Sequence, residues 1–98
     1  TLKTIISDVV IFENSDEKRI EGNVIFIRAA DPGYDFLFSK KIGGLVTQFG
    51  GANSHMAIRC AELGIPAVIG VGEQNYLQWS SYKKIAIDCL KRQVIKIA

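Results

Sequence analysis

The chain has few of the side chains that most often build catalytic and metal sites. Among 98 residues there are one histidine, two cysteines and one tryptophan. Cys60 and Cys89 form no Cys-x-x-Cys pair and no second histidine exists, so a zinc site, which needs about four ligands, is not expected. We interpret both cysteines as small buried hydrophobic residues, and we expect a reducing, cytoplasmic location.

Long apolar runs and concentrated charge are also missing. No run approaches the roughly 20 apolar residues that span a bilayer, and no segment has the pattern of a secretory signal. The net charge is +2 and the basic residues are scattered, whereas nucleic-acid binding needs a dense basic face. Membrane and nucleic-acid partners are therefore not expected.

The chain does contain enough apolar sequence for one small domain. Hydrophobic residues make up 48% and charged residues 22%, which fits a single folded domain over residues 1–98. The first residue is Thr1 rather than methionine, as expected for a fragment of a larger multidomain protein or for a processed chain.

The order of apolar runs and turn residues predicts a compact α/β fold with a mixed sheet and short helices. One run, residues 23–28, is continuously apolar in its middle, which indicates burial on both faces. Segment 73–81 fits no single pattern and stays undecided. The expected strands are 5–12, 23–28, 45–47 and 67–71, followed by a hairpin of 84–88 and 93–97. The expected helices are 31–40, which begins at Asp31-Pro32, and 54–63, which is ended by Gly64 and Pro66.

The single histidine lies in the most informative segment, residues 50–58, where two glycines lead into the second expected helix. His55 falls in the first turn, where unpaired N–H groups and partial positive charge attract a phosphoryl group. The same charge disfavours imidazolium, and a neutral imidazole has a lone pair that can form a covalent intermediate. His55 is therefore a candidate nucleophile for phosphoryl transfer.

Residues just before His55 are candidate phosphate ligands. Gly50 and Gly51 predict a tight turn with positive φ, which lets backbone N–H groups approach an anion. Asn53 and Ser54 are both good N-cap residues. We expect one of them to cap the helix and the other to face the phosphate.

A helical projection adds one cation to the candidate site. At about 100° per residue, His55, Arg59 and Glu62 fall in one narrow polar sector, and the rest of the helix is expected to form a broad buried face. Helical side chains lean toward the N-terminus, so Arg59 can reach back and pair with a phosphate on the imidazole. The alternative is an ordinary solvated arginine that pairs with Glu62.

Other nucleophilic schemes fit the sequence poorly. Ser54 is the immediate neighbour of His55 and cannot easily present its hydroxyl to that ring. Cys60 lies about 140° around the helix from His55. Asp31 and Asp35 are interpreted as capping and helix-surface residues rather than as a catalytic carboxylate pair.

Residues 50–58 are followed closely by the run Glu62-Leu63-Gly64-Ile65-Pro66-Ala67-Val68-Ile69-Gly70. Together these two segments closely resemble the phosphohistidine (swivelling) domain of the phosphoenolpyruvate-utilising enzymes. Asp31-Pro32 and residues 44–47 extend the resemblance to about 31–72. It implies a compact β/β/α carrier domain that is phosphorylated on His55. It also implies partner domains in the same protein: an ATP-grasp domain, which binds ATP and Mg²⁺, and a domain for phosphoenolpyruvate and pyruvate or another acceptor. The carrier itself would bind no cofactor and would be inactive alone.

Three positions depart from the pattern of the family. Met56 stands where alanine is common, Asn53 stands where many members have threonine, and Ala61 stands where an arginine is frequent. Arg59, on the correct side of the helix, could replace that arginine. The departures at Asn53 and Ala61 motivate an alternative function: a non-catalytic docking or regulatory module that retains the fold and binds an anion without forming a P–N bond.

Overall fold

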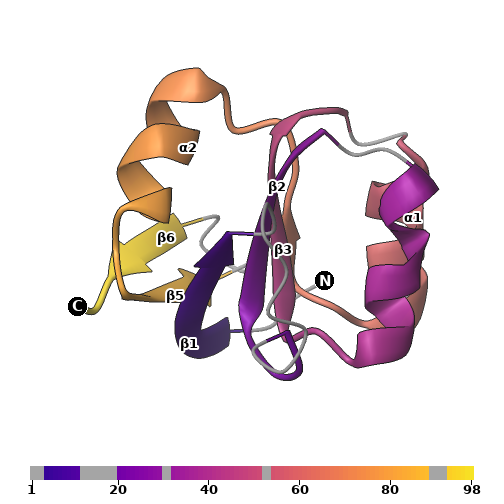
Figure 1. Cartoon of the computed structure of the whole chain (residues 1–98), viewed down its shortest axis with the longest axis horizontal. Coiled ribbons are helices and arrows are strands. Elements are labelled where there is room, and N and C mark those ends of the chain that lie inside the picture. The colour runs from indigo at the N-terminus through magenta and orange to yellow at the C-terminus, as the bar shows by residue number, and fades with distance from the viewer. Residues whose placement is uncertain (1–3, 12–19, 30–31, 52–53, 89–92) are drawn as a thin grey trace.

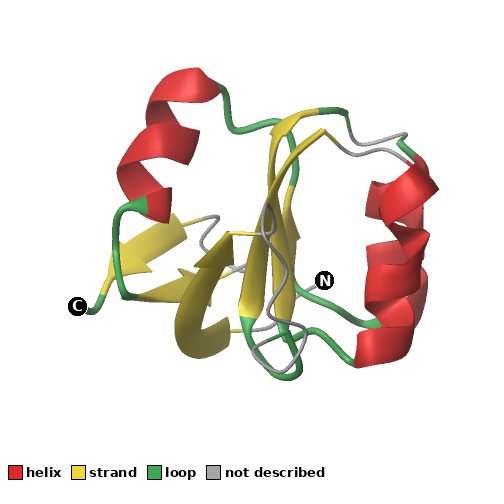
Figure 2. Ribbon diagram, viewed as in Figure 1, coloured by secondary structure: helices red, strands yellow, loops and turns green. Residues whose placement is uncertain are grey.

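The computed structural model describes residues 4–11, 20–29, 32–51, 54–88 and 93–98. In these segments a six-stranded mixed sheet has helices on both faces (Figures 1 and 2), which confirms the predicted α/β class. The strands are β1 (Thr4–Ile11), β2 (Val24–Ala29), β3 (Gly44–Phe49), β4 (Ala67–Val68), β5 (Lys84–Asp88) and β6 (Gln93–Lys96). The helices are the 3₁₀-helix η2 (Pro32–Lys40), α1 (His55–Leu63) and α2 (Glu73–Ser80).

The sheet has the strand order β4-β3-β2-β1-β5-β6. Strands β1 to β4 run parallel to one another, and β5 and β6 pair antiparallel, with Ala86 opposite Ile95. This pairing confirms the predicted hairpin, whose turn at 90–92 lies outside the described residues. Because β2 and β3 are parallel, their carboxyl ends lie at the same edge of the sheet. The helices that follow them, η2 and α1, therefore begin close together at that edge.

The central strand β2 separates two apolar cores. Ile25 and Ile27 pack with residues of η2 and α1 on one face, whereas Val24 and Phe26 pack with residues of α2 on the other. All four side chains are essentially inaccessible to solvent. The predicted burial of this run on both faces is confirmed, and it explains why the strand shows no polar alternation.

A pair of identical substitutions tests this placement. Ile25→Val removes one methylene from a fully buried side chain and is expected to lower the free energy of unfolding by about 1 kcal/mol. Ile6→Val makes the same change in β1 at a side chain that is 61% exposed, where we expect less than about 0.5 kcal/mol. Urea unfolding of both variants measures the difference, and equal losses would contradict the assignment of Ile25 to the core.

One segment differs from the sequence-based prediction, and the structure decides a second segment that the sequence left open. The strand predicted over 67–71 ends at Val68, because Gly70 adopts a φ of 71° that extended backbone does not have. The undecided segment 73–81 forms α2. Tyr76 is fully buried and Trp79 is partly buried against the same core, whereas Leu77 is 51% exposed, so the helix covers this core through two aromatic side chains.

The expectation of a broad buried face on α1 is wrong. Only Met56 and Cys60 are buried, whereas Ile58 and Leu63 are each 48% exposed. The helix lies at the outside of the molecule (Figure 1), and it packs on one side only, against the core that includes Leu37 of η2. No helix in the described segments is long and apolar enough to cross a membrane.

Candidate functional site

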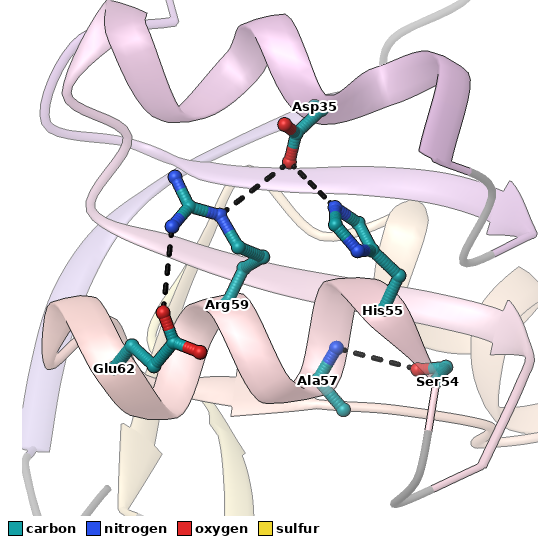
Figure 3. Close-up of polar contacts among 6 residues, drawn as sticks. All are labelled: Asp35, Ser54, His55, Ala57, Arg59 and Glu62. Atoms are coloured by element: carbon teal, nitrogen blue, oxygen red, sulfur yellow. Dashed lines mark hydrogen bonds and ion pairs between the residues drawn. The ribbon is translucent and has the colours of Figure 1, made fainter.

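The start of α1 is fixed by Ser54. Its backbone is extended (φ −66°, ψ 153°), and its Oγ accepts a hydrogen bond from the backbone N–H of Ala57 at 3.3 Å (Figure 3). Its own N–H donates to the carbonyl of Gly51 at 3.0 Å. Of the two expected caps, Ser54 therefore caps the helix, and Asn53 lies outside the described residues. Ser54 and Asn53 as phosphate ligands stay predictions.

The glycine turn before α1 is tightly packed at one position. Gly50 has a φ of 129°, as predicted, but Gly51 does not adopt a positive φ. The Cα of Gly70 lies so close to Gly50 that a Cβ on it would overlap the carbonyl oxygen of Gly50. The N–H of Gly70 donates to Oγ1 of Thr47 at 3.0 Å. The end of β3 and the segment after β4 thus hold the turn that leads toward His55.

His55 is the first residue of α1, and its ring meets a carboxylate from another element. Its Nε2 lies 3.1 Å from Oδ1 of Asp35, which belongs to η2 (Figure 3). Both side chains are 45% exposed. Asp35 lies on the surface of its helix, as expected, but its contact with the candidate nucleophile was not anticipated.

The order of helices and strands along the sequence could have indicated this contact between Asp35 and His55. Asp35 is in the first turn of η2, which follows β2, and His55 is in the first turn of α1, which follows β3. Neighbouring parallel strands place the helices that follow them at one edge of the sheet. Two polar residues in those first turns are therefore candidates to meet, although they are 20 positions apart.

Arg59 lies one turn along α1 and contacts two carboxylates, while its predicted pairing with a phosphate stays a prediction. Its Nε is 3.7 Å from the same Oδ1 of Asp35 that contacts His55, and its Nη1 donates to Oε2 of Glu62 at 3.4 Å (Figure 3). The guanidinium also lies over the ring of Phe38, 5.6 Å from the ring centroid. Arg59 is thus paired with Glu62 and also directed toward the side of the helix that carries His55.

This arrangement can serve a reaction at the surface of the domain. An exposed imidazole, a carboxylate and a guanidinium lie together at the start of a capped helix, where the helix dipole favours negative charge. Within the segments that the structure describes, no three His, Cys, Asp or Glu side chains are grouped to hold a metal ion. The polar groups that are present suit an anion that carries several oxygen atoms.

Cys60 lies on the opposite, buried side of α1 and is 1% exposed, which confirms its interpretation as a core residue; Cys89 lies outside the described residues. Burial raises the pKa of the Cys60 thiol from 9.0 to about 11, because an apolar surrounding disfavours the thiolate. The thiol is therefore protonated at neutral pH and is no second nucleophile for the site.

The high pKa of Cys60 predicts slow alkylation. In a Cys89→Ser chain at pH 8, the two-unit rise in pKa lowers the thiolate fraction, and with it the rate with iodoacetamide, by about 100-fold relative to the urea-unfolded chain. The rate of the folded chain is expected to increase as the pH approaches 11. Equal rates in the folded and unfolded chains at pH 8 would contradict the burial of this thiol.

Comparison with known proteins identifies the domain. A sequence profile described as "PEP-utilising enzyme, mobile domain" matches residues 19–92. Phosphoenolpyruvate synthase of Escherichia coli (strain K12) is 43% identical over 65 residues, which are 65% of this chain. Phosphoenolpyruvate synthase of Aquifex aeolicus is 44% identical over 69 residues, or 70% of the chain, and rifampicin phosphotransferase of Bacillus cereus is 40% identical over 62 residues, or 63% of the chain.

The matched region is a small part of each relative. It covers 8% of each of the two phosphoenolpyruvate synthases and 7% of the rifampicin phosphotransferase. The relatives are enzymes, and the similarity concerns one domain of each. The profile match includes both Asp35 and the whole of α1, and on this evidence the chain belongs to the mobile-domain family of the PEP-utilising enzymes.

Proposed function

We propose that the chain is a phosphoryl-carrier domain in which His55 is transiently phosphorylated. The observation that carries the proposal is the placement of His55: it is half exposed, it is the first residue of a capped helix, and Arg59 lies beside it. An exposed ring can enter the active site of another domain, and a cation beside it stabilises a phosphoryl group. The P–N bond forms as the ring's lone pair attacks phosphorus and the donor's leaving oxygen keeps the electron pair of the broken P–O bond.

The rest of the machinery belongs, in this proposal, to partner domains of the same protein. Phosphoryl transfer depends on positioning and charge stabilisation, and the described part of this site offers one nucleophile, His55, and one cation, Arg59, for that purpose. An ATP-grasp domain would bind ATP and Mg²⁺, and a second domain would bind phosphoenolpyruvate and pyruvate or another acceptor. The isolated chain would therefore catalyse no turnover.

The acceptor, in this proposal, is selected by the domain that the carrier visits. The names of two relatives, phosphoenolpyruvate synthase and rifampicin phosphotransferase, refer to different reactions, although their matched regions resemble this chain to a similar degree. This difference supports placing specificity outside the carrier domain.

The test uses the intact protein that contains this chain. Incubation with a labelled phosphoryl donor, phosphoenolpyruvate or ATP, is expected to give an acid-labile, base-stable label, as a P–N bond requires, on the peptide that contains His55. Reversible anion binding without any P–N bond would instead support the docking or regulatory module.

A further inference from the structure

The contact between Asp35 and His55 poses a chemical problem for a phosphoryl carrier. In the described structure one carboxylate oxygen, Oδ1 of Asp35, lies 3.1 Å from Nε2 of His55 and 3.7 Å from Nε of Arg59. These are the two groups that the proposed function assigns to the phosphoryl group, one as acceptor and one as counter-ion. A phosphoryl group on Nε2 would require the space that Asp35 now occupies, and its oxygen atoms would require the Arg59 donor that Asp35 now contacts.

We propose that Asp35 is a positioning residue that holds the place of the phosphoryl group in the unphosphorylated domain and gives up both contacts when that group arrives. The inference rests on the proposed function of His55. Asp35 and a phosphoryl group are both anions, so they cannot share one imidazole nitrogen without strong repulsion. Arg59 would then exchange Asp35 for phosphoryl oxygen atoms, with which it forms stronger, charge-assisted hydrogen bonds.

The geometry favours Nε2 over Nδ1 as the nitrogen that receives the group. Arg59 is the cation that the structure places beside this ring, and it contacts the oxygen atom that faces Nε2. A group on Nδ1 would leave Asp35 in place, and Arg59 would remain between two carboxylates, those of Asp35 and Glu62. Transfer to Nε2 displaces the Asp35 carboxylate, so that Arg59 becomes available to bind the phosphoryl oxygen atoms.

Exposure makes the exchange energetically accessible. The side chains of His55 and Asp35 are each 45% exposed and that of Arg59 is 35% exposed. Ion pairs in such positions contribute little net stability, because water competes for both partners. Asp35 can therefore rotate into solvent while Leu37, which is fully buried, keeps η2 anchored to the core.

The proton balance of the step is simple. In the resting contact Nε2 carries the proton that the Asp35 carboxylate accepts. Before attack this proton leaves to water and the ring carries its proton on Nδ1, so that the lone pair of Nε2 is free. The lone pair forms the new P–N bond as the donor's bond to phosphorus breaks and the leaving group keeps that electron pair.

A small phosphoryl donor tests the proposal without the partner domains' own substrates. The full chain is incubated with phosphoramidate, whose own P–N bond breaks to release ammonia, and phosphate on the His55 peptide is measured over time. Alkaline hydrolysis and chromatography then separate the two phosphohistidine isomers. Asp35→Ala is expected to raise the initial rate about 3- to 10-fold, because a competing anion is removed, and the product is the Nε2 isomer.

Three further variants make the result specific. Asp35→Glu, which keeps the charge, is expected to stay near the wild-type rate. Glu73→Gln removes one exposed carboxylate from α2 and is expected to leave the rate unchanged, which excludes an effect of net charge. In the double variant Asp35→Ala, Arg59→Gln, the gain is expected to disappear, because the cation that receives the group is gone.

The failures of the two proposals are distinguishable. A lower or unchanged rate in Asp35→Ala, a full gain that persists without Arg59, or phosphate on Nδ1 would overturn the role of Asp35 while leaving His55 as the carrier. If neither the wild-type chain nor Asp35→Ala takes up phosphate on His55, the proposed function itself is overturned. A merely structural role of Asp35 would lower the rate in both Asp35→Ala and Asp35→Glu.

Discussion

Replacement of His55 by asparagine is expected to reduce phosphoryl labelling of the intact protein by at least about 1,000-fold, equivalent to about 4 kcal/mol of activation free energy. The amide nitrogen of asparagine has no available lone pair, so no P–N bond can form there. Asparagine is otherwise a mild substitute: its helix propensity is similar to that of histidine, and the contact with Asp35 that it loses joins two side chains that are each 45% exposed. The free energy of unfolding is expected to change by no more than about 0.5 kcal/mol.

The control for this variant is an exposed polar residue of α2, on the other side of the sheet. Gln74→Asn makes a change of similar size at a position that has no part in the site, and it is expected to label at the wild-type rate. Labelling and turnover that persist in His55→Asn would end the carrier hypothesis. Loss of both in Gln74→Asn would show that the assay reports folding rather than chemistry.

The boundaries of α1 could be predicted from sequence because they are set locally. Ser54 caps the first turn with its own side chain, and Gly64 ends the helix with a φ of 70°. Both are interactions within a few residues, and only certain residue types can make them. The position of His55 in the first turn follows directly from these caps.

The environment of His55 could not be derived in the same way. Its contact with Asp35 depends on η2 and α1 lying side by side, which requires the parallel pairing of β2 with β3. A helical projection treats α1 alone, so it found Arg59 and Glu62 but not the carboxylate that comes from another element. Because the projection leaves out the elements that pack against α1, it also predicted too broad a buried face for this helix.

The helix α2 was undecided for a different reason. Its sequence is polar at most positions, and it packs through Tyr76, whose ring centroid lies 5.6 Å from that of Phe26, and through the partly buried Trp79. Two aromatic contacts in a short polar segment produce too weak a helical periodicity to be recognised. Only the tertiary core against which Tyr76 packs makes this segment an element of the fold.

Gly70→Ala is expected to lower the free energy of unfolding by about 3 kcal/mol or more, and it also tests how the turn before α1 is held. Gly70 has a φ of 71°, a conformation that costs a residue with a Cβ about 1–2 kcal/mol. The new Cβ would also overlap the carbonyl oxygen of Gly50, and forced overlap of this kind costs about 1–3 kcal/mol more. Backbone cannot rotate away as a side chain can, so the two segments must separate.

Gly22→Ala isolates the contribution of that overlap. Gly22 has a similar φ of 77°, but within the described segments no atom other than those of its chain neighbours lies within 4 Å of the position that its Cβ would occupy, so only the conformational cost of about 1–2 kcal/mol is expected. Gly70→Ala is also expected to slow labelling of His55 in the fraction of chains that remains folded, because Gly50 leads into the turn before His55. Displacements of about 1 Å in a reacting group reduce rates strongly. Gly22→Ala is not expected to slow labelling.

Urea unfolding and labelling of both variants test these expectations. Equal losses of stability would mean that Gly70 and Gly50 are not in close contact. A destabilised Gly70→Ala chain that still labels at the wild-type rate would mean that the turn does not position the histidine.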